Sequence, residues 1–338
     1  MNLAKYFHLA ALVAAFLIPV HAVADEPNRK PAVTSITTEN DFFGGGTDRN
    51  YSNGVRLERV SAADDVFPAL DWVAHRLPWL DLDRTDLRQG FALSHVIFTP
   101  EDIRSPVADS LDRPYAAWLA VSGTVTASDE DTQDTLQINL GVVGPSAGGE
   151  FIQNNWHKAI GLDQALGWES QLRDEPGIEI IGQRLQTWPG PELPMGLETD
   201  FGAHVTGAIG NVRTYAGGGM TARIGWDLDS SFGPPRIRPA LSGAGEFIPG
   251  TVADPLGGYI FIGGDIRAVA RDMFLDGNLW RDGPRVNDRR TVVADLQLGA
   301  AVHYQNVQVA FTIVNRTEQF KRQNGPQRFG AISFSVAR

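Results

Sequence analysis

Residues 136–142, Leu-Gln-Ile-Asn-Leu-Gly-Val, decide the fold that we predict for this chain. Apolar residues occupy every second position, and polar or small residues lie between them. Because successive side chains of a strand point to opposite faces, this pattern predicts a strand with one apolar and one polar face. The same alternation recurs around Ile262, Leu298, Phe311 and Phe334.

Twelve stretches with strand periodicity follow one another, separated by turns rich in Gly, Pro, Asn and Asp. They lie near residues 32–39, 53–62, 88–97, 115–127, 133–144, 177–187, 197–210, 217–227, 257–271, 291–304, 306–316 and 327–337. A soluble β-sandwich would alternate too, but strands of roughly ten residues suit a tilted membrane crossing, whereas globular strands have about five or six. We therefore predict an all-β fold, a transmembrane outer-membrane β-barrel of about twelve antiparallel strands.

One interval breaks the strand pattern. Gly148-Gly149 is followed by a stretch, residues 150–160, whose apolar positions are spaced as on a short helix. If the barrel is right, this helix must lie at the rim or inside the lumen, because irregular backbone exposed to lipid is not tolerated.

The N-terminus predicts export. Lys5, an apolar run from Leu9 to Val20 and the small residues Ala22-Val23-Ala24 have the order of a signal peptide, which we place at residues 1–24. The run is shorter than the roughly 20 residues of a spanning helix. Residues 25–338 are predicted to form a single barrel domain of an outer-membrane protein.

Composition limits the partners of the chain. Its net charge is −11 and it has no dense cluster of Lys and Arg, so nucleic acid is not an expected partner. It has no cysteine, so an exported chain of this size must be held together without disulfides.

The usual motifs of hydrolases are missing. No Gly-x-Ser-x-Gly elbow occurs, and Ser146, which lies in a glycine-rich segment, is interpreted as part of a strand-to-helix turn. The sequence also lacks a phosphate-binding P-loop, a dinucleotide fingerprint and a His-Glu-x-x-His zinc motif.

Two polar groups of residues remain as candidates. Gln153 and His157 are four residues apart and share one face of the predicted helix, where histidine suits a general base that activates water. A histidine near a helix end is also often structural. Glu39-Asn40-Asp41 precedes a glycine-rich turn, and its oxygens would suit Ca²⁺, although Asn, Asp and Gly populate ordinary hairpin turns as well.

In several separate blocks, found in the expected order, the chain resembles the lipid A 3'-O-deacylase family of Gram-negative outer membranes. The blocks are Glu39-Asn40-Asp41, residues 47–54, Phe98-Thr99-Pro100, residues 112–118, residues 141–149, residues 153–158 and residues 167–176. The resemblance implies a twelve-stranded barrel that acts as a carboxylic ester hydrolase. Its implied reaction is the Ca²⁺-dependent removal of the 3'-linked acyloxyacyl group of lipid A in lipopolysaccharide, and we expect a monomer surrounded by outer-membrane lipid.

The resemblance also implies roles for particular residues. His157 occupies the position of the family's histidine, which activates water, and Gln153 matches the residue one helical turn before it. Asn40 and Asp41 match an Asn-Asp pair beside the metal, and Asp41 is counted with the catalytic residues. Asp163 falls where the family has an acidic residue, commonly Glu, and is carried over as a metal ligand.

Substrate identity is the point on which the sequence departs from the family. After Thr99-Pro100 the family tends to place a basic residue that would contact a lipid A phosphate, whereas this chain has Glu101-Asp102. Arg104 or Arg113 would have to supply that charge. An outer-membrane phospholipase or other lipid esterase, and a non-enzymatic barrel protein, therefore remain as alternatives.

Overall fold

The computed structural model describes residues 31–45, 49–76, 86–107, 109, 111–233, 247 and 255–338. The predicted signal peptide, residues 1–24, and the first residues of the predicted barrel domain lie outside this part of the chain. The account below concerns the unit from Pro31 to Arg338.

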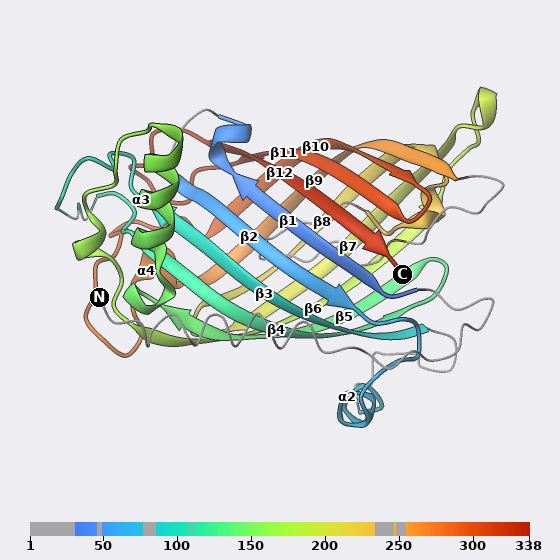
Figure 1. The fold of residues 1–338 in the computed structure, drawn as a ribbon, viewed down its shortest axis with the longest axis horizontal. Coiled ribbons are helices and arrows are strands. Elements are labelled where there is room, and N and C mark those ends of the chain that lie inside the picture. The colour runs from blue at the N-terminus through green and yellow to red at the C-terminus, as the bar shows by residue number, and fades with distance from the viewer. Residues whose placement is uncertain are drawn as a thin grey trace. The chain divides into compact units, whose positions relative to one another are not determined.

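Within the described residues, twelve antiparallel strands form a closed barrel in which each strand pairs with its neighbours in sequence (Figure 1). The strands are β1 (Val33–Asn40), β2 (Asn50–Val60), β3 (Asp86–Thr99), β4 (Ala116–Ser128), β5 (Thr132–Val143), β6 (Glu175–Pro189), β7 (Glu198–Gly210), β8 (Arg213–Trp226), β9 (Leu256–Asp272), β10 (Val292–Tyr304), β11 (Val307–Arg316) and β12 (Gln327–Ala337). The predicted all-β barrel is confirmed, and all twelve predicted stretches are strands.

The ring closes between its first and last strands. β1 pairs with β12 over its full length, from Val33 opposite Ala337 to Asn40 opposite Gly330. Closure satisfies the backbone of every strand on both sides, which a strand in a membrane requires because lipid offers no hydrogen bonds. β8 begins four residues earlier than predicted, at Arg213.

Three α-helices occur in the described residues: α2 (Pro68–Ala74), α3 (Gly149–Ile160) and α4 (Met273–Asp276). α3 confirms the helix predicted near residues 150–160, and α2 and α4 were not predicted. None of the described helices is long and apolar enough to cross a membrane. α3 and α4 lie at the same end of the barrel (Figure 1).

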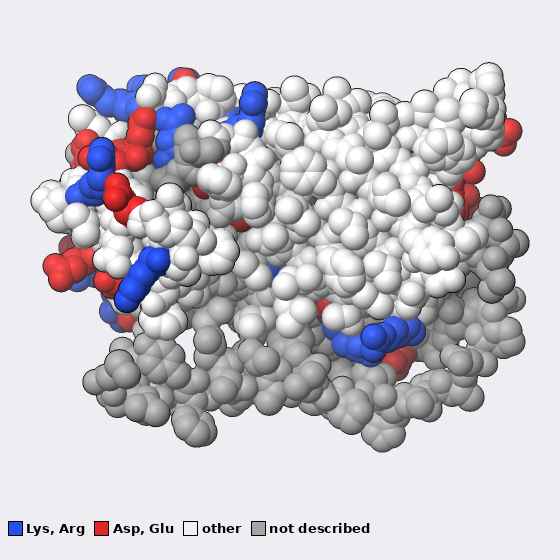
Figure 2. All heavy atoms as spheres, turned by 45° about the horizontal axis from the view of Figure 1, so that its top comes forward, with Lys and Arg blue, Asp and Glu red and all other residues white. Residues whose placement is uncertain are grey.

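The outer face of the barrel is apolar. Outward-facing side chains of the strands are large and hydrophobic, and many of them are exposed, among them Ile36, Val121, Ile138, Leu140, Ile178, Val205, Ile262, Leu298, Phe311 and Phe334. On the face shown in Figure 2, most charged side chains gather at the end that carries α3, and the strand surface is largely uncharged. A soluble protein rarely exposes an apolar surface of this extent, whereas a barrel in lipid needs it.

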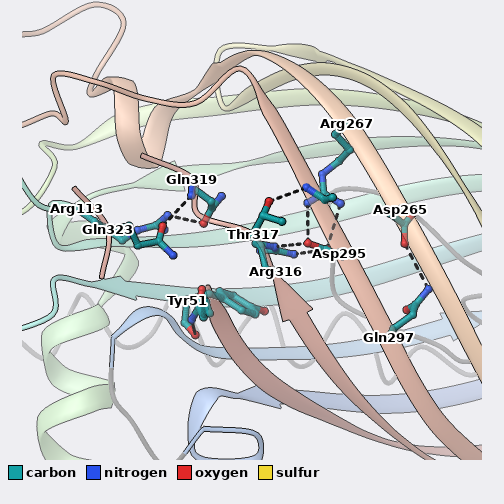
Figure 3. A network of polar contacts seen from close by, with 12 residues as sticks. Tyr51, Arg113, Asp265, Arg267, Asp295, Gln297, Arg316, Thr317, Gln319 and Gln323 are labelled. Atoms are coloured by element: carbon teal, nitrogen blue, oxygen red, sulfur yellow. Dashed lines mark hydrogen bonds and ion pairs between the residues drawn. The ribbon is translucent and has the colours of Figure 1, made fainter. Parts of the chain in front are cut away.

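The inner face is polar and is filled with paired charges. Asp295 on β10 accepts hydrogen bonds from Arg316 on β11 at 2.9 Å and from Arg267 on β9 at 3.2 Å (Figure 3). Farther round the wall, Arg213 on β8 donates to Glu179 on β6 at 2.8 Å. All of these side chains except that of Arg213, which is 15% exposed, are almost fully buried, so each charge depends on its partner across the strands.

α4 folds into the lumen rather than away from the barrel. Its residues Met273, Phe274 and Leu275 are buried, and the ring of Phe274 stacks on Phe98 of β3 with centroids 4.2 Å apart. Phe98 and Trp118 also line a small lumenal cavity of about 70 Å³, which is bordered by the Arg213 and Glu179 pair. Apolar packing therefore narrows the lumen at the end that carries α3.

We expect Asp295→Asn to lower the free energy of unfolding by about 3 kcal/mol, because it removes the charge of the buried carboxylate that pairs with both Arg267 and Arg316. The measurement is the denaturant midpoint of the folded barrel in detergent. The matched control is Asp288→Asn, whose pair with Lys321 is exposed and contributes little. Equal midpoints for the two variants would contradict a structural role for the lumenal network.

Candidate functional site

α3 lies against the outer wall of the barrel. Along β4, Trp118 and Ala120 line the lumenal cavity, so the alternating residues Ala117 and Leu119 face outward. Ala117 is nevertheless fully buried, in a cluster with Ile97 of β3 and with residues that flank α3, including Trp168. Of the two predicted positions, the rim or the lumen, the helix therefore occupies the rim, where it packs on the outer side of the wall.

The close approach of α3 to the wall depends on a glycine. A Cβ atom on Gly149 would lie 2.6 Å from the Cβ of Ala117 and 2.4 Å from the indole ring of Trp168. The helix is bounded by Gly148 and Gly161, both with positive φ, and Gly161 has the left-handed conformation common where a helix ends. The side chain of Asn154 also exchanges two hydrogen bonds with the backbone of Ala165, which fixes the segment after α3.

Gln153 and His157 are the polar residues of α3 that face the wall, and both are buried. The indole N–H of Trp168 donates to Oε1 of Gln153 at 2.9 Å. Nδ1 of His157 is hydrogen-bonded to the backbone carbonyl of Asp163. Because a carbonyl only accepts, Nδ1 carries the proton, and Nε2 is the basic nitrogen of the neutral ring.

The predicted group Glu39-Asn40-Asp41 is divided by the wall. Glu39 belongs to the inward-facing positions of β1 and Asn40 to the outward-facing positions, while Asp41 begins the 3₁₀ helix η1 (Asp41–Phe43). Oδ1 of Asn40 accepts from the backbone N–H of Phe42 at 2.8 Å, and Oδ2 of the buried Asp41 accepts from that of Arg49 at 2.7 Å. Asn40 and Asp41 therefore stay together beside the outer face.

Strand register brings Asn40 towards α3. Asn40 is opposite Asn53 on β2, Asn53 is opposite Ile97 on β3, and Ile97 is opposite Ala117 on β4, where α3 begins. Neighbouring strands lie about 4.8 Å apart, so this row spans roughly 14 Å of the outer wall. The two predicted groups thus flank one strip of wall, although they are more than 100 residues apart in sequence.

Buried polar side chains occupy the end of this strip. Asn50, Ser52 and Thr99 are all nearly inaccessible, and the hydroxyls of Ser52 and Thr99 are 2.5 Å apart. Asn50 lies opposite Thr99 on the neighbouring strand, and its Oδ1 has no hydrogen-bond partner among the described residues. A buried amide oxygen without a partner is costly, so this position is suited to a cation or water.

The donor set fits Ca²⁺ better than a softer metal. The described residues contain no group of three or more His, Cys, Asp or Glu side chains that could hold a metal ion. Around Asn40 the available atoms are instead amide, hydroxyl and carboxylate oxygens, from Asn40, Asp41, Asn50 and Ser52. Oxygen ligands of this kind suit hard cations.

Two other predicted residues are placed as follows. The carboxylate of Asp163 is exposed, and the contact that connects this residue to the site is its carbonyl, bound to His157. Its assignment as a metal ligand stays a prediction. Ser146 lies in η2 (Pro145–Ala147), where its backbone N–H and its hydroxyl both bind the carboxylate of Asp174, in agreement with its interpretation as a turn residue.

The sequence analysis missed Arg49. Its guanidinium pairs with Glu101 at 2.7 Å, and its backbone binds Asp41, so it places positive charge beside the site. Arg113 is instead buried and donates to Gln319, and Arg104 pairs with Asp102 at an exposed position. The acidic residue after Thr99-Pro100 was the available signal, because a carboxylate there calls for a nearby cation.

Comparisons with known proteins give one family match and several structural similarities. A family model described as outer membrane protein LpxR matches residues 9–338. LpxR from Salmonella typhimurium has a similar structure, with a TM-score of 0.74 and 22% identity over 90% of this chain and 100% of that one. The β domain of the Bordetella autotransporter BrkA gives a TM-score of 0.45 at 9% identity, over 92% of this chain and 99% of that one. A search of curated protein sequences found no match.

We expect Gly149→Val to lower activity at this site at least tenfold while leaving the barrel folded. The new side chain would collide with Ala117 and Trp168, so α3 would have to move off the wall and carry His157 with it. The measurement is hydrolytic activity alongside the denaturant midpoint in detergent. Gly123→Ala on β4, where an added Cβ meets nothing within 4 Å, is the control. Full activity of Gly149→Val would show that the seating of α3 is not required.

Proposed function

This chain belongs to the LpxR outer membrane protein family, and we propose that it is a lipid A deacylase that hydrolyses the 3'-linked acyloxyacyl ester. The observation that carries the proposal is the burial of His157 and Gln153 between a helix and the lipid-facing side of a membrane barrel. A substrate held in the membrane could reach this side laterally. The lumen, in contrast, is narrowed by α4 and crossed by paired charges.

His157 acts as the general base. The carbonyl of Asp163 holds the Nδ1 proton and fixes the ring, so Nε2 takes the proton from a water molecule that attacks the ester carbonyl. The tetrahedral intermediate then breaks the bond to the sugar oxygen, which receives the proton from His157 as it leaves. Water is the only nucleophile, so the reaction needs no acyl-enzyme.

Gln153 positions the reacting groups. Its Oε1 is directed at the indole N–H of Trp168, which sets the plane of the amide and the direction of its NH₂ group. That group donates to the attacking water or to the ester oxygen. Trp168 is itself packed on Ala117 of β4. The barrel wall therefore fixes the orientation of Gln153 through Trp168.

Ca²⁺ is the proposed cofactor, held by oxygens of Asn40 and Asp41, with the unpartnered Oδ1 of Asn50 beside them. When bound, the cation would polarise the ester carbonyl and stabilise the negative charge that develops on its oxygen. Asp41 is held by the backbone of Arg49, and the charge of Arg49 suits a phosphate of lipid A. This arginine takes the place of the basic residue that the resemblance predicts after Thr99-Pro100.

A lipid esterase acting on glycerophospholipids would use the same site, so substrate choice needs a direct test. We expect wild-type protein in detergent to release the 3'-linked acyloxyacyl group from lipid A with Ca²⁺, and His157→Ala to lose activity by at least 100-fold. Mass spectrometry of the lipid products is the measurement, with glycerophospholipids tested in parallel. The control is His75→Ala, which changes an exposed histidine after α2. Retained activity in folded His157→Ala would remove this residue from the mechanism.

The proposed metal ligands can be tested by the Ca²⁺ dependence of activity. We expect Asp41→Asn to raise the Ca²⁺ concentration for half-maximal activity at least tenfold, because a buried carboxylate loses its charge. If the carboxylate of Asp163 is a metal ligand, Asp163→Asn also raises the Ca²⁺ concentration for half-maximal activity. An unchanged Ca²⁺ concentration would mean that Asp163 acts only through its carbonyl, which binds His157. Calcium titrations of activity measure both, with the exposed Asp109→Asn as the control. Activity that survives chelation would overturn the role of Ca²⁺.

A further inference from the structure

α3 carries an exposed apolar surface next to its buried polar stripe. Ile152 and Trp156 precede the wall-facing residues Gln153 and His157 by one position, and Ile160 follows Trp156 by four, so the three form one line along the helix. Their exposed fractions are 40%, 58% and 50%. Leu162 and Leu166, which follow the helix, are also exposed. We call these five residues the apolar ridge.

The opposite side of α3 is mainly polar. Glu150, Asn155 and Lys158 are exposed there, together with a single large apolar residue, Phe151. A helix facing water on all its free sides would not keep large apolar residues exposed in a continuous line. A continuous apolar side next to a mainly polar side, as here, is typical of helices that lie in the interface between a membrane and water.

The ridge continues the lipid-facing surface of the barrel. Val121, Leu140 and Ile178 lie opposite one another on β4, β5 and β6, and all three are exposed on the outer face. The next outward row towards α3 contains Leu119 and Val142, which pack against the cluster that includes Trp168. No charged residue lies in either row, so the apolar surface reaches the base of α3 without interruption.

The position of α3 agrees with an interface. In Figure 1 the helix crosses the ends of the strands instead of extending along them, so its long side faces the edge of the apolar belt. Exposed aromatic residues occur at the same end, with Phe42 and Phe43 in η1 and Trp280 after α4, together with Trp156 itself. Aromatic side chains are enriched where a membrane meets water.

We propose that the apolar ridge of α3 is seated in bilayer lipid at the membrane interface, so that α3 is a membrane-contacting element and not a water-facing cover. Gln153 and His157 occupy the neighbouring stripe, which places them at the depth where the acyl esters of a membrane lipid begin. The inference that the apolar ridge contacts lipid rests only on the geometry of α3 and the barrel. The inference that Gln153 and His157 lie at the depth of the acyl esters rests on the proposed function as well.

Because the chain has no cysteine, single labels can test the seating. Trp156→Cys on the ridge and Asn155→Cys on the polar side each receive a nitroxide, and the protein is placed in phospholipid vesicles without lipid A. We expect electron paramagnetic resonance to find position 156 accessible to oxygen and protected from a water-soluble nickel relaxant, with the reverse at 155. Equal aqueous accessibility at both positions would overturn the proposal. Protection of position 156 only after lipid A is added would also overturn it, since the ridge would then bind substrate chains.

Activity gives a second readout. In Ile152→Ser/Ile160→Ser, we expect KM for lipid A in vesicles to rise about tenfold, with kcat and the activity on detergent-dispersed lipid A unchanged. Glu150→Gln/Lys158→Gln, on the polar side, is the matched control and keeps the wild-type KM. Equal losses of activity in vesicles and in detergent would show that the ridge only stabilises the structure of the site. That result would contradict a role in membrane contact. Wild-type protein inactive in both formats would refute the proposed function but leave the label measurement to decide the seating.

Discussion

Closure of the strand ladder between β1 and β12 is the constraint on which the other features depend. In lipid an unpaired strand edge would leave a row of N–H and C=O groups without partners, so every strand must have two neighbours. The eight residue pairs between Val33 and Asn40 and the last strand meet that requirement. They also fix the register at the end of β1, and with it the position of Asn40 on the outer face. The same pairing that seals the barrel therefore positions one side of the candidate site.

In a closed barrel, alternate side chains of each strand face the lumen or the lipid. Here the lumenal side chains stabilise the fold, and the candidate site lies on the lipid-facing side. Inward positions carry charges that neutralise one another, as Asp295 does with Arg267 and Arg316. Outward positions are apolar over most of their length and become polar at the two ends of the barrel; at the end that carries α3, the outward polar residues include Ser52 and Thr99. An outward polar group would be costly in lipid unless something covers it, and α3 with its flanking segments provides that cover for β3 and β4. The site thus lies where the wall is both polar and shielded.

The sequence predicted features that depend on local pattern and missed those that depend on long-range contact. All twelve strands and the helix near residues 150–160 follow from periodicity, and the resemblance pointed to Asn40, Asp41, Gln153 and His157. The side of the wall on which α3 lies could not be predicted, because it is set by contacts of Gly149 with Ala117 and Trp168, which no periodicity encodes. The inward turn of α4 and the pairing of Arg49 with Glu101 depend in the same way on residues distant in sequence. Asp163 illustrates a third limit: a resemblance names a residue but does not say whether its carboxylate or its carbonyl is used.

The orientation of His157 can be followed back to the barrel wall through a short series of contacts. Ala117 is small enough for Gly149 and Trp168 to pack directly on β4, and Trp168 in turn directs the amide of Gln153. Gly161 ends α3 one turn after His157, which lets the chain bend back and bring the carbonyl of Asp163 to Nδ1. A rigid wall is a better foundation for such an arrangement than a free loop, because displacement of one member requires repacking of the others. The packing of α3 on β4 therefore has two consequences. Apolar residues are exposed on one side of the helix, and His157, on the neighbouring side, is held in a single tautomer.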